Sequence, residues 1–234
     1  MQFSTWNTIK LQAKMVSRMN FTIIFGELIK GDLMQMFREL HSSDLPLFSL
    51  NFGVITLLPK TQDASKIQQY KHICLLNVSF KIFTKVATIR INSVAEDLIS
   101  STQTAFMRGR NILEGVVILH ETIHELHRKN QSEVIFKIDF EKAYDKVRWD
   151  FLMPTLRMKG FSLKWIGWIK SFISGWSVAI NVNDKVGPFF QTKKGLQQGD
   201  PLSAILLNIM ANMLALFINR AKKRISCEIR CPIM

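Results

Sequence analysis

Apolar side chains recur at helical spacing along much of the chain. In residues 27–40 they line one face, which predicts an amphipathic helix. The other stretches with this spacing are residues 78–99, 112–128 and the tryptophan-rich 164–174. Asp150 is placed to cap a helix that runs toward Gly160, and Pro201 suits the first turn of a final, strongly apolar helix.

Shorter apolar runs rich in β-branched side chains predict strands. Residues 54–58 form one such run, and the polar stretch TQDASKIQQYK (61–71) after it is expected to be a loop. Residues 134–139 predict a second strand. Residues 177–182 and 189–192 flank the turn NDKVG, which predicts a hairpin. Because strands and helices are interspersed without a regular βαβ rhythm, we expect an α+β fold rather than a doubly wound sheet.

The composition adds a preference for polyanions. The formal net charge is +13, and residues 151–234 hold most of the excess, with 12 basic side chains against 3 acidic ones. This balance indicates nucleic acid as a partner, ahead of a membrane surface, although a merely soluble basic surface would show the same composition. A hydrophobic fraction of 47% argues against global disorder.

The cysteines, the basic N-terminal segment and the apolar segment near the C-terminus indicate where in the cell the protein would reside. Three cysteines, of which Cys227 and Cys231 form a lone C-x3-C, favour a reducing compartment over a disulfide framework. Residues 1–26 contain three basic side chains and no acid, which is a faint indication of a transit peptide. Residues 202–218 are short for a membrane span, which needs about 20 apolar residues, and include Ser203, Asn208 and Asn212. A helix buried in a protein core explains them better.

Two segments could carry phosphate chemistry. Asp139 closes the predicted strand at 134–139, where a solvent-facing carboxylate can bind Mg²⁺, although a strand-end Asp can also simply cap a turn. The segment KKGLQQGDPLS (193–203) has two glycines that admit close backbone approach, followed by the N-terminal end of a helix. It is consistent with phosphate or nucleotide binding, and equally with an ordinary turn into a helix.

A third segment suggests a different class of enzyme. HETIH, residues 120–124, matches the H-E-x-x-H pattern of zinc metallopeptidases, with His120 and His124 as ligands and Glu121 as the base. A helix with His on its solvent face and Val116, Val117, Ile123 and Leu126 toward the core explains the same residues. No third ligand is evident.

Five segments taken together resemble the reverse transcriptase domain of non-LTR (LINE-type) retrotransposons common in plant genomes. In chain order they are ITLLPK (55–60), QYKHICLLNVSFKIFTKV (69–86), QTAFMRGRNILEG (103–115), FKIDFEKAYDKVRWDFL (136–152) and KKGLQQGDPLSAILLNI (193–209). The resemblance covers residues 20–222 and leaves 1–19 and 223–234 unassigned. It implies a right-hand polymerase fold with fingers and palm, and RNA-directed DNA polymerase activity on an RNA template, a DNA primer and dNTPs.

The resemblance also implies roles for individual residues. Asp139 looks like the first catalytic aspartate and a ligand of both Mg²⁺ ions, with the backbone carbonyl of Phe140 as a further metal ligand. Tyr144 resembles the gate that excludes a ribose 2′-hydroxyl. The other implied nucleotide-binding residues are Gln198, Gly199, Lys60 and Lys71. Lys71 stands where the family usually has Arg, and so lacks the bidentate fork.

In the family, the partner of the first aspartate is the Asp pair of a [FY]ADD hairpin, and no Asp-Asp occurs in this sequence. We therefore expect a fingers-and-palm fragment, truncated at both ends and without the thumb, that is inactive alone. The alternatives are a non-catalytic nucleic-acid-binding remnant and, more remotely, the zinc peptidase. An intracellular location, in nucleus or cytoplasm, is expected if the chain is expressed, with no membrane partner. The oligomeric state is left open.

Overall fold

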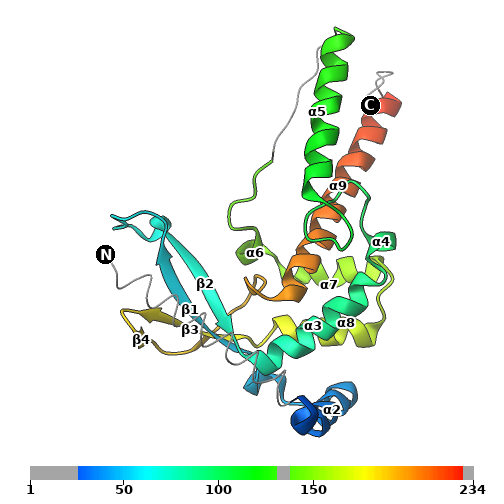
Figure 1. Cartoon of the computed structure of the whole chain (residues 1–234). Helices are drawn as coiled ribbons and strands as arrows, with labels where there is room; N and C mark the ends of the chain where they lie inside the picture. Colours follow the sequence, from blue (N-terminus) through cyan, green and yellow to red (C-terminus); the bar gives the residue numbers. More distant parts are fainter. Residues whose placement is uncertain (1–25, 131–137, 229–234) are drawn as a thin grey trace. The chain divides into compact units, whose positions relative to one another are not determined.

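The computed structural model describes residues 26–130 and 138–228, with only the backbone for 222–228. These residues fall into two compact units (Figure 1). The first extends to Thr84 and includes Ser171–Lys193, and the second comprises Lys85–Lys170 and the residues from Lys194 onward.

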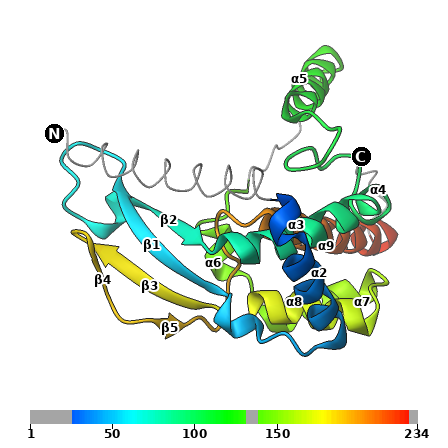
Figure 2. The same cartoon turned by 60° about the horizontal axis from the view of Figure 1, so that its bottom comes forward.

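The first unit contains the sheet. Its central strand β1 (Phe52–Pro59) pairs antiparallel with β2 (Tyr70–Leu76) and parallel with β3 (Ser177–Val182). The two short strands β4 (Lys185–Val186) and β5 (Phe190–Gln191) both pair antiparallel with β3. Figure 2 shows β1 lying between β2 and β3.

A buried asparagine and an apolar cluster stabilise the sheet where the parallel strands β1 and β3 begin. The fully buried Asn51 donates from its Nδ2 to the carbonyl of Phe172 at 2.9 Å, and its own carbonyl accepts from Ser177 N at 3.0 Å. An apolar cluster beside it comprises Cys74, Leu76, Trp176 and Val178. Burial raises the pKa of the Cys74 thiol to about 12, an effect that Lys81 partly offsets.

Helices complete the first unit. They are α2 (Gly26–Ser42), the short 3-10 turns Leu47–Ser49 and Ile67–Gln69, and the first part of α3 (Val78–Asn92). The rings of Phe37 and Phe83 join α2 to α3, with centroids 4.6 Å apart, and Phe80 packs edge-on against Phe172. Aromatic contacts of this kind add to the free energy gained from burial.

The second unit is helical in its described part. Its helices are α4 (Ala95–Leu98), α5 (Ile112–Arg128), α6 (Ala143–Lys146), α7 (Trp149–Met158), most of α8 (Leu163–Ile173) and α9 (Pro201–Glu228). Its fully buried large side chains are Ile91, Ile99, Leu152, Leu156, Ile169, Leu202, Ile205, Leu206 and Ile209. Most of them lie on α7 and on the first half of α9, so this helix pair forms the core.

The buried asparagines of α9 all have partners in the same unit. Asn208 accepts from Gln103 Nε2 at 3.1 Å and donates to the carbonyl of Ala105 at 2.6 Å. Asn212 accepts from Lys159 Nζ at 2.6 Å. Among the described residues, Pro201–Ala221 is the one helix long and apolar enough to cross a membrane, and 44% of its 18-residue apolar window is buried. The hydrogen-bonded asparagines support the interpretation of its first half as a core helix.

Several predicted elements are confirmed. The helix over residues 112–128 matches α5, where the Asn111 side chain accepts from Leu113 N at 3.0 Å as the N-cap. A hairpin forms as predicted, with its turn at Asn183 and Asp184, which both have positive φ, as the tight turns between antiparallel strands require. Its return strand begins already at Lys185, inside the predicted turn, and the strand predicted at 189–192 is the short β5. The helix at 164–174 and the first-turn position of Pro201 are also observed, and the mixture of helices and strands confirms the α+β class.

Other predictions are wrong. Residues 70–76 form strand β2, although the first two were assigned to a loop, because the register against β1 outweighs their polarity. The helix predicted over 78–99 is broken into α3 and α4, since Ser93 Oγ bonds to the carbonyl of Arg90 at 2.7 Å and competes with the helical pattern. Asp150 is not the N-cap of α7. That position is Arg148, whose guanidinium pairs with the Asp150 carboxylate in the first turn.

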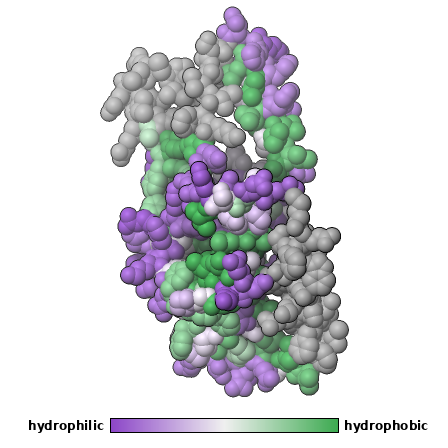
Figure 3. Space-filling model, turned by 90° about the vertical axis from the view of Figure 1, so that its left-hand side faces the viewer, coloured by the Kyte–Doolittle hydropathy of each residue, from purple (hydrophilic) through white to green (hydrophobic). Residues whose placement is uncertain are grey.

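The environment of α5 also differs from the prediction. Val116 and Val117 were expected to face the core, but they are 58% and 53% exposed, and no α5 side chain is buried among the described residues. Figure 3 shows apolar atoms at the surface toward the top of the view, the height at which α5 rises in Figure 1. Of the strand predicted at 134–139, residues 134–137 lie outside the described part, and Ile138 and Asp139 are not in a strand.

Candidate nucleotide-binding site

Asp139 and Phe140 lie in an irregular segment that leads into α6, and both are exposed. Among the described residues, no ion pair engages the Asp139 carboxylate. A free, solvent-facing carboxylate is a hard oxygen ligand of the kind that divalent cations such as Mg²⁺ prefer. Asp139 therefore fits one ligand of such a site, and the adjacent carbonyl of Phe140 can supply another oxygen.

The segment then turns sharply into α6. Lys142 has a φ of +52°, and its carbonyl accepts from Asp145 N at 3.0 Å and Lys146 N at 3.2 Å. The Lys146 ammonium also donates to the Glu141 carboxylate at 2.9 Å and lowers the pKa of Glu141. These contacts hold the turn between Asp139 and Tyr144.

Tyr144, on α6, is half-buried. Burial raises the pKa of its phenol above the ordinary value, so the hydroxyl keeps its proton at neutral pH. A ring in this state is a neutral, flat surface with one donor at its tip, which suits contact with a sugar.

Three hydrogen bonds join the Asp139–Tyr144 region to the glycine-bounded loop some fifty residues later in the chain. Leu196 N donates to the carbonyl of Tyr144 at 2.8 Å, and Gly195 N to that of Val147 at 2.8 Å. Trp149 Nε1 donates to the carbonyl of Gly195 at 2.7 Å. The structure thus brings together the two segments that the sequence singled out for phosphate chemistry.

This union requires glycine at position 195. Gly195 has a φ of +91°, and a Cβ there would lie 3.0 Å from the carbonyl oxygen of Asp145 and 3.2 Å from its Cα. Both neighbours are backbone atoms, which cannot rotate away as a side chain can. A side chain at Gly195 would therefore push the loop off α6.

The rest of the loop leads into α9. Asp200 is buried, and its Oδ2 accepts from Ser203 N at 3.2 Å and Ser203 Oγ at 3.4 Å, so it acts as a helix cap. Gln198 is half-buried, and Gly199 is exposed with a φ of +99°. These two residues are the accessible ones between Gly195 and Asp200.

Lys60 and Lys71 belong to the other unit. Leu58 pairs with Lys71 across β1 and β2, and Lys60 N donates to the carbonyl of Gln69 at 2.8 Å. Both lysines are exposed and lie at the same end of this strand pair. Their predicted contact with a triphosphate stays a prediction.

The HETIH residues lie on α5, where His120, Glu121 and His124 are all exposed. Within residues 26–130 and 138–228, no group of three or more His, Cys, Asp or Glu side chains is arranged to hold a metal ion. The zinc site stays a prediction, because the described residues supply no third ligand beside His120 and His124.

Comparison with known proteins gives the family. Residues 58–230, well over half of the chain, match the family described as "Reverse transcriptase (RNA-dependent DNA polymerase)". The chain belongs to this reverse transcriptase family. The match includes Asp139, Tyr144, Gln198 and both lysines.

Relatives of this reverse transcriptase chain are proteins of transposons and retrotransposable elements. The "Transposon TX1 uncharacterized 149 kDa protein" of Xenopus laevis is 27% identical over 190 residues, which cover 81% of this chain and 14% of that protein. The "Retrovirus-related Pol polyprotein from type-2 retrotransposable element R2DM" of Drosophila melanogaster is 24% identical and covers 71% of this chain and 16% of that protein. The chain thus spans about a seventh of the length of these relatives. Together they confirm the predicted kinship with non-LTR elements.

Among solved structures, apo telomerase from Candida Tropicalis, truncated from its C-terminal domain, is similar to this reverse transcriptase chain. The TM-score is 0.46 with 14% identity, over 70% of this chain and 39% of that one.

Sequence reasoning missed two residues that stabilise the second unit. Trp149 donates to the carbonyl of Gly195 in the glycine-bounded loop. The only sequence feature that could have indicated this contact was a single Trp five residues after Tyr144. Arg110 donates to the carbonyls of Ser100 at 2.6 Å and Gln103 at 2.7 Å, which fixes the segment before α5. Its position beside the N-cap Asn111 was the available signal.

Proposed function

We propose that residues 20–222 form the fingers and part of the palm of a retrotransposon RNA-directed DNA polymerase. The observation that carries the proposal is the trio of hydrogen bonds between the Asp139–Trp149 region and Gly195–Leu196. They join the glycine-bounded loop to the segment that follows the exposed Asp139 and carries the half-buried Tyr144, which supports a nucleotide site built from both segments.

The reaction we propose is attack by the 3′-hydroxyl of a DNA primer on the α-phosphate of a dNTP, directed by an RNA template. Asp139 and the carbonyl of Phe140 would hold Mg²⁺, which supplies neutralisation of the charge that develops on the phosphate. Tyr144 lies under the sugar and excludes a 2′-hydroxyl by its ring.

The loop and the lysines complete nucleotide binding in this proposal. Gln198 contributes its amide and Gly199 a backbone without a side chain, so that a base and sugar can approach closely. Lys60 and Lys71 bind the triphosphate as cations, Lys71 as a point charge rather than a fork.

We also propose that these 234 residues alone do not extend a primer. Phosphoryl transfer of this kind uses at least two metal-binding carboxylates, and the sequence offers no Asp-Asp pair beside Asp139. The chain is then a nucleotide- and nucleic-acid-binding part of the polymerase site.

The test measures binding and synthesis separately. Binding of a fluorescent dNTP in Mg²⁺ is compared for the wild type, Asp139→Asn and the matched control Asp97→Asn, which removes the same charge from an exposed residue of α4. We expect Asp139→Asn, or removal of Mg²⁺ with a chelator, to weaken binding about tenfold or more, as loss of a charge-assisted contact should. Equal binding by all variants would refute the site. Primer extension on an RNA template that depends on Asp139 would refute the proposed inactivity.

The high positive charge favours nucleic-acid binding as a second, non-catalytic function of the same chain. Because it would depend on phosphate contacts, the affinity for single-stranded RNA should fall steeply as salt rises. An affinity that is independent of salt would refute this function.

A further inference from the structure

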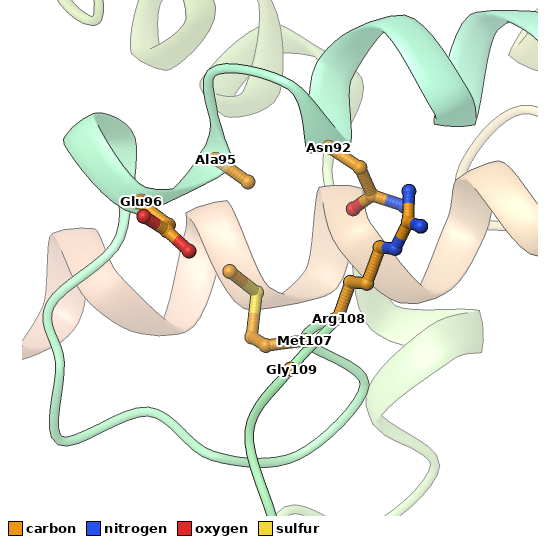
Figure 4. A pocket seen from close by; sticks show the side chains of 6 residues that line it. All are labelled: Asn92, Ala95, Glu96, Met107, Arg108 and Gly109. Carbon is orange, nitrogen blue, oxygen red and sulfur yellow. The ribbon is translucent and has the colours of Figure 1, made fainter.

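A small pocket lies in the second unit, in a part of the chain that the proposed polymerase site does not use. It has a volume of about 270 Å³ and is lined by Asn92, Ala95, Glu96, Met107, Arg108 and Gly109. Asn92 ends α3, Ala95 and Glu96 begin α4, and the other three residues precede α5 (Figure 4). The carbonyl contacts of Arg110 hold the segment that carries Arg108 in place.

The lining side chains offer hydrogen-bonding groups of both kinds. In Figure 4 the Glu96 carboxylate lies on one side of Met107, and the Arg108 guanidinium lies beside the Asn92 amide on the other. Asn92 Oδ1 is buried without a hydrogen-bond partner among the described residues. Whichever way its amide is turned, Asn92 presents a donor or an acceptor there.

This combination excludes simple ions. A phosphate bound to Arg108 would be repelled by the negative charge of Glu96, and a cation bound to Glu96 would be repelled by the positive charge of Arg108. The pocket therefore fits a neutral group with donors on one edge and acceptors on another. The thioether of the buried Met107 between them favours an aromatic ring.

A chain with high positive charge attracts nucleic acid, whose bases are neutral aromatic groups. Of these bases, guanine fits the pocket best. Guanine presents two adjacent donors, N1–H and the N2 amino group, which match the two oxygens of a carboxylate. Its O6 and N7 are acceptors that match the fork of Arg. Adenine and cytosine each place a ring acceptor beside their amino donor, so a carboxylate at that edge is repelled.

We propose that this pocket binds an unpaired guanine, with Glu96 on its Watson–Crick edge and Arg108 on O6 and N7. Ala95 and Gly109 leave room for a flat ring, because a Cβ at Gly109 would meet no atom within 4 Å. The size of the pocket suits one base, whereas pockets for drug-sized ligands start at about 300 Å³. The site is independent of Asp139, so it goes beyond the proposed polymerase function.

The test uses fluorescence anisotropy with the full chain. The probes are labelled oligouridylates that differ only in one central residue, guanosine or adenosine. We expect about tenfold tighter binding of the guanosine probe, in line with the discrimination that one bidentate contact provides. Glu96→Gln should abolish this preference, because the amide offers a single acceptor and its NH2 group faces one of the two guanine donors in either orientation. Asp97→Asn, which makes the same charge change at the adjacent residue, should keep the preference.

The source of the base is resolved by competition. If GMP but not AMP displaces the guanosine probe, the pocket also takes free nucleotides. If neither competes while the preference persists, it reads guanine within a strand. Equal binding of both probes by the wild type, or an unchanged preference in Glu96→Gln, would overturn the proposal. Because Glu96 is exposed, its replacement does not threaten the fold, which circular dichroism checks.

Discussion

Replacement of Gly195 by alanine tests the contact that unites the two segments of the candidate site. The new methyl group would lie 3.0 Å from the carbonyl oxygen of Asp145 and 3.2 Å from its Cα. The residue would also have to keep a φ of +91°, which an L-residue with a side chain disfavours. The first effect costs roughly 1–3 kcal/mol as overpacking and the second about 1–2 kcal/mol, so the free energy of unfolding should fall by about 2–5 kcal/mol.

Gly160 provides a matched control in the same unit. Its φ is +87°, nearly that of Gly195, but a Cβ there would meet no atom within 4 Å. Gly160→Ala should therefore lose only the conformational part, about 1–2 kcal/mol. The difference between the two variants isolates the close approach to Asp145.

Urea unfolding followed by circular dichroism measures both losses. With a slope of about 2 kcal/mol per molar urea, Gly195→Ala should lower the midpoint by about 1–2.5 M and Gly160→Ala by about 0.5–1 M. A transition should remain measurable, because domains of ordinary stability have about 5–15 kcal/mol to lose. Equal midpoints for the two variants would refute the view that the close approach of the Asp145 backbone requires glycine at position 195.

Three further predictions concern residues outside this contact. Pro154 is exposed and lies inside α7 beyond its first turn, where it has no N–H to donate to the carbonyl of Asp150. Pro154→Ala should restore this donor and raise the free energy of unfolding by about 1–3 kcal/mol. An unchanged urea midpoint would contradict this. Burial lowers the pKa of Lys159, so at pH values just below the ordinary lysine pKa the unfolded chain binds more protons, and stability should rise with pH in that window. The same rise in Lys159→Met would count against it. Burial holds the pKa of Cys74 at about 12 instead of 9.0, so the folded protein has far less of the reactive thiolate. In a chain with Cys227→Ser and Cys231→Ser, an aromatic disulfide reagent at mildly alkaline pH should therefore label the folded protein roughly a thousandfold more slowly than the urea-unfolded one. Comparable rates would show that the thiol is accessible.

The elements that could be predicted from the sequence have signals within a few residues. Asn111 caps α5 through Leu113 N, and Asn183 and Asp184 adopt the positive φ of a tight turn. In each case the deciding interaction joins neighbours in the chain, so local pattern is sufficient. The wrong assignments arise where a distant partner decides. Strand β2 begins with the polar residues Tyr70 and Lys71, and only pairing with β1 makes it a strand.

The same distinction applies to the candidate site. Asp139 and the glycine-bounded loop were recognisable as segments, but the hydrogen bonds between Leu196, Gly195, Tyr144 and Val147 join residues far apart in sequence. Spacing carries no information about such pairs. The guanine pocket was missed for the same reason, because Glu96 and Arg108 come from different elements and neither belongs to a recognisable motif.

The sequence left two interpretations of residues 193–203 open, a phosphate-binding loop and an ordinary turn into a helix, and the structure divides them residue by residue. Gly195 serves the backbone approach to Asp145, Leu196 and Gln197 are buried, and Asp200 caps α9. These residues are accounted for by folding alone. Between Gly195 and Asp200, ligand contact is left to the Gln198 side chain and the Gly199 backbone. Most of the segment is therefore structural, and nucleotide contact by its accessible middle stays a prediction.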